Sequence, residues 1–115
     1  MVILERGAVH RVRLDPTEGH EQRGMARPCL IIQRNSLRNS GTAIVLPLTS
    51  QKPKADFPLT VHLKAGTGGN QIECWARITQ IRVVNETRIE ATKLAQLNEL
   101  ELESIKSALH EILDI

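Results

Sequence analysis

The chain has 115 residues, of which 41% are hydrophobic, so it can bury one modest core and is too apolar to be disordered. Aromatic residues make up only 2%, which argues against a nucleic-acid binder that works mainly by stacking bases on aromatic side chains. The net charge of +2 divides into +5 over residues 1–64 and −3 over residues 65–115. A basic front half suits a polyanion such as RNA, although an ordinary mixed surface is the simpler reading of charge alone.

The two cysteines, Cys29 and Cys74, lie in apolar, strand-like runs. This placement favours buried free thiols over a disulfide framework, and free thiols suit the cytoplasm. The sequence has no signal peptide and no apolar stretch long enough to cross a bilayer. We therefore expect a soluble cytoplasmic protein, without membrane attachment, folded as one domain over residues 1–115.

Alternation of apolar and polar residues predicts several short strands. In residues 8–14, the phase of His10, Val12 and Leu14 alternates with that of Val9, Arg11 and Arg13, as in a half-buried strand with a basic outer face. After a polar loop over residues 17–26, Pro28 opens a second strand over residues 29–33, at a position that tolerates proline. Residues 42–48 and 59–64 are the next strands, joined by a basic connection with two prolines over residues 51–58.

The apolar phase changes inside the last strand-like run, residues 71–84, which follows a glycine-rich turn at residues 66–70. Up to Ile78 the apolar residues share one face, but Ile81 and Val83 fall on the other. A bulge or bend near Thr79 and Gln80 would resolve this conflict, and bulges are how small barrels turn their corners. Short strands with such a corner predict a small β-barrel.

The C-terminus changes to a helical period. Asn98 is a good N-cap and Glu101 follows three residues later, the spacing of a capping box. An apolar stripe then predicts a helix that packs on the barrel or on a second subunit: Leu102, Ile105, Leu109, Ile112 and Leu113.

Few residue patterns suit catalysis. The four histidines are scattered and neither cysteine has a partner at ligand spacing, so we expect no metal and no other cofactor. Arg27, held by Pro28 at the mouth of the barrel, could present a forked guanidinium to a phosphate. Thr49, at the end of a neighbouring strand, could add a hydroxyl. Simpler readings are a surface salt bridge of Arg27 with Glu18 or Glu21, and a turn-capping role for Thr49.

Four segments in order resemble the MazF/PemK family of bacterial toxin endoribonucleases. They are R-G-A-V at residues 6–9, G-H-E-Q…R-P-C-L-I-I at residues 19–32, A-I-V-L-P-L-T-S at residues 43–50 and Q-I-R at residues 80–82; the C-terminal residues fit the family's closing helix. The resemblance implies an SH3-like barrel with a C-terminal helix and a homodimer. It also implies a toxin–antitoxin system, metal-independent cleavage of single-stranded RNA, and inhibition by an antitoxin.

The same resemblance assigns roles to residues. The family's catalytic arginine falls on Arg27 and its threonine on Thr49, whereas Glu21, Gln22 and Ser50 match positions that contact RNA. Two departures stand out: Gly24-Met25-Ala26 resembles a one-residue insertion, and Arg77 and Thr79 replace the more usual apolar and acidic residues.

The implied reaction is attack of a ribose 2′-hydroxyl on the adjacent phosphate, leaving a 2′,3′-cyclic phosphate and a 5′-hydroxyl. Because a guanidinium is hard to deprotonate, His20 and Glu21 are the candidates for the acid or base. The alternatives are a non-catalytic CcdB-like toxin that binds gyrase, which would not need Arg27, and a plain RNA-binding barrel.

Overall fold

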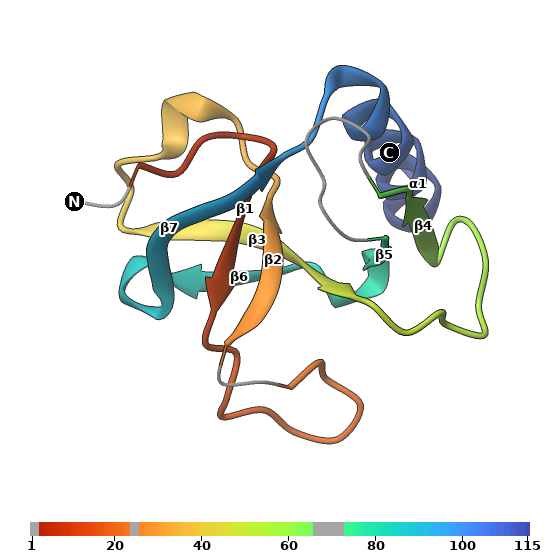
Figure 1. Ribbon diagram of the computed structural model, residues 1–115, viewed down its shortest axis with the longest axis horizontal. Coiled ribbons are helices and arrows are strands. Elements are labelled where there is room, and N and C mark those ends of the chain that lie inside the picture. The colour runs from red at the N-terminus through yellow and green to blue at the C-terminus, as the bar shows by residue number, and fades with distance from the viewer. Residues whose placement is uncertain (1–2, 24–25, 66–72) are drawn as a thin grey trace.

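The computed structural model, which describes residues 3–23, 26–65 and 73–115, shows a strongly bent antiparallel sheet with one helix beside it (Figure 1). The elements are β1 Ala8–Val12, β2 Arg27–Ile31, β3 Thr42–Thr49, β4 Thr60–Leu63, β5 Cys74–Arg77, β6 Arg82–Asn85, β7 Ile89–Gln96 and α1 Glu99–Leu113, with 3-10 turns η1 Asn35–Leu37, η3 Ile78–Gln80 and η4 Glu86–Arg88. The predicted class, mainly β with a C-terminal helix, is confirmed. The predicted turn at residues 66–70 and part of the insertion before Arg27 lie outside the described residues.

The sheet is organised around β3, the longest strand together with β7. The strand order is β4-β5-β3-β2-β1-β7, and β6 pairs with β3 from the side. The first half of β3 pairs with β6 and its end pairs with β5, so two strands that follow each other in the chain share one long partner. No ladder joins the edge strands β4 and β7 in the described part of the chain, so the barrel-like sheet curls without closing.

Both faces of the central strands are buried, because alternate residues enter two separate cores. In β2, Leu30 enters the core that α1 covers, together with Leu46 and Leu48 of β3. Cys29 and Val45 enter the second core, on the opposite face. Strands buried on both faces are held rigidly, so residues at their ends have well-defined positions.

The corner predicted from the change of apolar phase is confirmed. The described part of this run, residues 73–84, does not form one strand: η3 separates β5 from β6, and Ile78 in this turn is fully buried. The backbone N–H of Ile81 donates to the carbonyl oxygen of Ile78 at 3.3 Å, which closes the turn. The bend lets Val84 face the second core although it has the same phase as Ala76, which faces the helix-side core.

Three sequence expectations need correction. Strand β7 was not predicted, because half of its residues are polar and its apolar residues do not alternate regularly with them. Val9 was assigned to the outer face of β1 but is 4% exposed, since the helix-side core covers this face too. In α1, Leu113 is 48% exposed, and the buried stripe consists of Leu102, Ile105 and Ala108.

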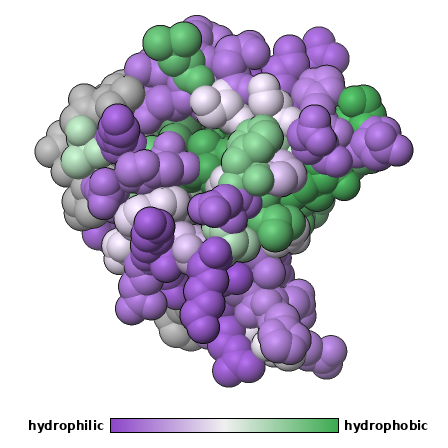
Figure 2. Space-filling model, turned by 90° about the vertical axis from the view of Figure 1, so that its right-hand side faces the viewer, coloured by the Kyte–Doolittle hydropathy of each residue, from purple (hydrophilic) through white to green (hydrophobic). Residues whose placement is uncertain are grey.

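The capping box of α1 is confirmed in both directions. Asn98 Oδ1 accepts from the backbone N–H of Glu101 at 2.9 Å, and Glu101 Oε1 accepts from the backbone N–H of Asn98 at 3.0 Å. Figure 2 shows the side of the molecule on which α1, β4 and the segment 51–59 lie. Apolar surface runs across this side between polar borders, and Phe57 and Leu100 are 55% and 79% exposed.

Candidate active site

Strand pairing brings Arg27 and Thr49 to the same end of neighbouring strands. The last recorded pair between β2 and β3 is Cys29 with Pro47, and Arg27 and Thr49 each lie two residues beyond it. Because side chains alternate along a strand, both point to the face opposite Leu30 and Leu48, away from the helix-side core. Both are half-buried. The arrangement offers a guanidinium and a hydroxyl to one ligand.

The simpler readings of these two residues have different outcomes. Among residues 3–23, 26–65 and 73–115, Arg27 makes no ion pair, and its Nε donates to the carbonyl oxygen of Arg23 at 3.3 Å. The carboxylate of Glu21 instead accepts from the backbone N–H of Glu18 at 2.7 Å. Thr49 does cap a turn, since its Oγ1 accepts from the backbone N–H of Gln51 at 3.2 Å. This bond uses a lone pair and leaves the hydroxyl hydrogen available for a phosphate oxygen.

The loop before Arg27 is anchored by residues from the corner η3. The Gln80 side chain accepts from the backbone N–H of Gln22 at 2.8 Å and donates to the carbonyl oxygen of His20 at 3.2 Å. The guanidinium of Arg77 donates to the side-chain oxygen of Gln22. Gln22, assigned by resemblance to substrate contact, therefore also ties the loop to β5.

The two candidate proton-transfer residues share a cavity with a second arginine. His20 and Glu21 line a space of about 360 Å³ with residues of the corner, including Arg82. Arg82 pairs with Val45 on β3 and so points to the same face as Arg27 and Thr49.

Thr49 itself opens into a basic cavity of about 430 Å³. Its cationic lining residues are Lys52, Lys54 and Arg77, and none of the described residues that line it is acidic. Thr79, which lines this cavity and also that of His20, places the two cavities next to each other. Such a surface concentrates positive charge beside the hydroxyl, as an anionic substrate requires.

Burial and nearby positive charges act on the pKa of Cys29 in opposite directions. Burial raises the pKa of its thiol to about 12, while the positive charges of Arg27 and Arg82 act in the opposite direction. Both guanidinium groups are therefore close enough to influence the same buried atom. Cys74 is half-buried, and burial followed by the charge of Glu101 raises the pKa of its thiol to about 11. Both cysteines are free thiols, as predicted, but only Cys29 is fully buried.

Other sequence expectations concern Ser50, metals and membranes. Ser50 is exposed directly after Thr49, and it makes no side-chain hydrogen bond to the site residues in the described ranges. The described residues contain no group of three His, Cys, Asp or Glu side chains that could hold a metal ion. None of the described helices is long and apolar enough to span a bilayer.

Sequence reasoning did not assign roles to Gln80, Arg82 or the lysines of the segment 51–58. The first two belong to the Q-I-R segment that carried the resemblance, so a signal existed without a position in space. Arg77 was visible only as a departure from the family pattern. Its contact with Gln22 shows that the departure adds an anchor for the loop.

Comparison with known proteins identifies the class of protein to which this chain belongs, a toxin of a toxin–antitoxin system. Residues 5–113 match the family model described as "PemK-like, MazF-like toxin of type II toxin-antitoxin system", and the chain belongs to this family. Endoribonuclease EndoA of Bacillus subtilis is 34% identical over 109 residues, covering 94% of this chain and 92% of EndoA. Endoribonuclease MazF9 of Mycobacterium tuberculosis is 32% identical over 110 residues, covering 84% of this chain and 92% of MazF9.

Solved structures confirm the fold. MazF from Deinococcus radiodurans superimposes with a TM-score of 0.84 and 22% identity, covering 100% of both chains. A mycobacterial endoribonuclease, solved in complex with its cognate antitoxin, gives a TM-score of 0.76 and 19% identity over 96% of this chain and 95% of its own.

Proposed function

We propose that this chain is the toxin of a toxin–antitoxin system and that it cleaves single-stranded RNA, including mRNA, at specific sequences without a metal ion, which inhibits translation and growth. The observation that carries the proposal is the pairing that places Arg27 and Thr49 at one sheet end beside a cavity lined by three cationic side chains. Relatives named as endoribonucleases, EndoA and MazF9, support the reaction class.

In the proposed reaction, the ribose 2′-oxygen attacks the adjacent phosphorus and the bond from phosphorus to the 5′-oxygen breaks. The 2′-proton passes to a base and the leaving 5′-oxygen takes up a proton. The products are a 2′,3′-cyclic phosphate and a 5′-hydroxyl. Arg27 and Thr49 donate hydrogen bonds to the phosphate oxygens, whose charge increases in the transition state, and loss of one such donor typically costs on the order of 100-fold or more in rate.

The proton-transfer step is assigned to His20 or Glu21, and Gln22 and Ser50 are the proposed RNA contacts beside them. Support comes from the cavity that His20 and Glu21 share with Arg82, since a guanidinium there would hold a phosphate within their reach. Comparison of the pH–rate profiles of His20→Ala and Glu21→Ala separates the two. The residue whose loss removes one limb of the profile is the base, and two unchanged profiles would place the base elsewhere.

The central experiment incubates purified protein with a long single-stranded RNA, with and without EDTA. We expect cleavage in both conditions for the wild type, and at least a 100-fold slower reaction for Arg27→Ala. Arg38→Ala is the matched control, because Arg38 is an exposed arginine just after η1 and outside the site. RNA with a 2′-deoxy nucleotide at the cut site should remain intact. Normal cleavage of that RNA, or by Arg27→Ala, would refute the mechanism.

We also propose a homodimer, a cognate antitoxin protein as partner and action in the cytoplasm. The proposal of an antitoxin partner is supported by the mycobacterial endoribonuclease that was solved in complex with its cognate antitoxin. The proposal of a cytoplasmic location is supported by the free thiols of Cys29 and Cys74. Exposed apolar side chains, such as Leu100 and Ile115, leave surface for a second copy. Light scattering behind a sizing column measures the dimer directly, and a monomer at micromolar concentration would contradict it. The gyrase-binding alternative is not favoured by relatives named as endoribonucleases.

A further inference from the structure

Strand register places an aromatic pair in line with Thr49. Thr49 of β3 is opposite Trp75 of β5, and Trp75 is opposite His62 of β4. All three point away from the helix-side core, because their neighbours Leu48, Ala76, Val61 and Leu63 fill it. Neighbouring strands are about 4.8 Å apart, so the backbones of Trp75 and His62 lie about 5 and about 10 Å from that of Thr49.

The two rings form a prearranged stack. Their centroids are 4.9 Å apart and their planes differ by 14°. The Nε2–H of His62 donates to a carboxylate oxygen of Glu73 at 2.9 Å, which fixes the imidazole from its edge. His62 is exposed, with 39% of its side chain open to solvent, whereas Trp75 is half-buried behind it. The pair therefore offers the face of one ring, supported by a second ring, to a further planar group.

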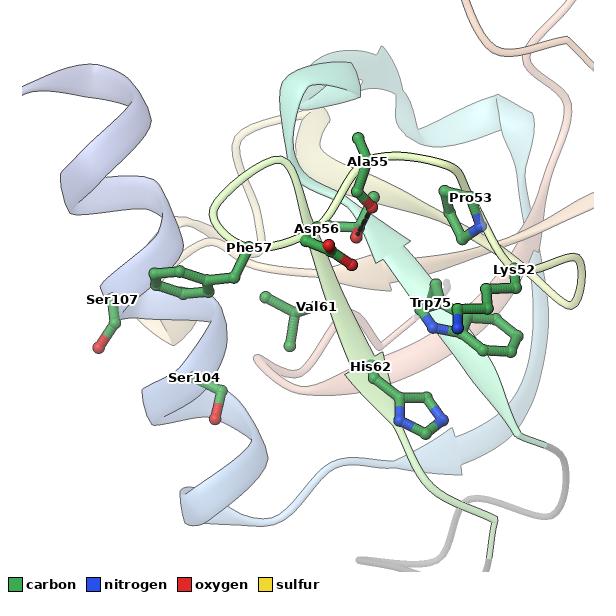
Figure 3. Close-up of a pocket in the computed structure, with 11 residues that line it drawn as sticks. Lys52, Pro53, Ala55, Asp56, Phe57, Val61, His62, Trp75, Ser104 and Ser107 are labelled. Atoms are coloured by element: carbon green, nitrogen blue, oxygen red, sulfur yellow. Dashed lines mark hydrogen bonds between the residues drawn. The ribbon is translucent and has the colours of Figure 1, made fainter.

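The stack borders a cavity of about 560 Å³ (Figure 3). Trp75, His62 and Lys52 lie on one side of the cavity, Val61 at its middle, and Phe57 with two serines of α1 on the other. This cavity shares Lys52 and Thr60 with the basic cavity that contains Thr49, so the two cavities adjoin. The strand register also places the aromatic stack within reach of a ligand bound at Thr49.

We propose that the His62–Trp75 pair is a nucleobase subsite for the RNA, in which a base next to the cleaved phosphate stacks on the imidazole and Lys52 contacts its phosphate. The inference rests on the proposed function and adds the position and the chemistry of substrate recognition. A nucleotide fits the two cavities better than an acidic peptide does, because the cavity of Thr49 holds cationic side chains for phosphate, whereas the other cavity holds flat aromatic rings for a base and is also lined by Asp56, which disfavours an acidic peptide. Although aromatics are too few for a stacking surface along the whole chain, two rings suffice for one base.

The chain carries its own probe for this contact, since Trp75 is its only tryptophan. We would titrate the wild-type protein with an all-deoxy single-stranded oligonucleotide, which the proposed reaction cannot cleave, and follow tryptophan emission. Binding is measured in parallel by the anisotropy of a labelled oligonucleotide. We expect saturable quenching at the concentrations at which anisotropy rises. An oligonucleotide of the same length built from abasic sites should bind through its phosphates and leave the emission unchanged.

Variants test the platform itself. His62→Ala should weaken binding of the base-containing oligonucleotide on the order of tenfold and leave that of the abasic one unchanged. His110→Ala is the matched control, because His110 is an exposed histidine near the end of α1. By anisotropy, Trp75→Phe should retain most of the affinity that Trp75→Ala loses, and thermal melting checks that each variant is folded.

The results separate this inference from the proposed function. RNA cleavage by a wild-type protein whose emission does not change on binding would overturn the base subsite and leave the ribonuclease intact. Quenching by the abasic oligonucleotide equal to that by the base-containing one would overturn it too, since the signal would then come from phosphate binding. Base-dependent quenching by a protein that cleaves no RNA would support the subsite and refute the catalytic proposal.

Discussion

Replacement of Thr49 by valine isolates the hydroxyl from the rest of the site. Valine keeps the β-branched shape that suits a strand, so the backbone of β3 should be preserved. The folded state loses one hydrogen bond, that from the backbone N–H of Gln51 at 3.2 Å. Because Gln51 is exposed and water can replace the lost acceptor, the cost in the free energy of unfolding should be at the low end of about 0.5–1.5 kcal/mol.

The expected loss of transition-state stabilisation in RNA cleavage is larger than this cost in the free energy of unfolding. Removal of one donor to a developing oxyanion typically costs on the order of 100-fold, which is about 2.7 kcal/mol of transition-state stabilisation. A single-turnover assay at saturating protein measures the chemical step. Thr49→Ser should retain most of the rate, and Thr42→Val is the matched control, because Thr42 is exposed at the other end of the same strand. A rate for Thr49→Val within about threefold of the wild type would refute the catalytic role and leave Thr49 as a turn cap only.

Three further predictions concern stability, each measured by urea denaturation. Gly7→Ala should cost about 1–3 kcal/mol, because φ is +91° and the new Cβ would lie 2.5 Å from a side-chain nitrogen, whereas Gly41→Ala, at φ +92° in open space, should cost less. Asn98→Ala should cost about 1 kcal/mol through loss of the helix cap, and Asn98→Asp should not. The Cys29 thiol titrates near pH 9.0 when unfolded but only near about 12 when folded, so above pH 9 the unfolded state binds fewer protons. The contribution of this thiol to the free energy of unfolding is therefore complete below pH 9 and decreases towards pH 12 by up to about 1.4 kcal/mol per pH unit. The free energy of unfolding of Cys29→Ala should lack this decrease.

Helices and strands were predictable from the sequence wherever their apolar residues form a continuous run or a regular period. Strand β3 and the capped helix α1 were both expected, because one is a continuous apolar run and the other carries a capping box before an apolar stripe. The corner η3 was expected from the conflict of phase around Thr79. Strand β7 escaped prediction because its apolar residues follow no regular period, and its place in the sheet depends on pairing with β1.

The site was predictable in its residue types and only partly in its geometry. Arg27 and Thr49 were singled out by residue type and given catalytic roles by a family pattern, but their common face depends on a register between strands that no local pattern contains. The same holds for His62 and Trp75, which are separated by a long connection and become neighbours only through β4–β5 pairing. Composition pointed away from base stacking because it counts aromatic residues without locating them.

The mostly exposed segment 50–59 after β3 divides the chain into two parts that contribute different parts of the proposed site. Arg27 and Thr49 lie before it, whereas the aromatic stack, the corner and α1 lie after it. The helix-side core draws residues from both parts, so neither fragment can complete that core alone. A chain cut within this segment should therefore yield two fragments that are inactive apart and active when recombined. Co-expression of the two halves under separate promoters would turn a toxin into a two-input switch.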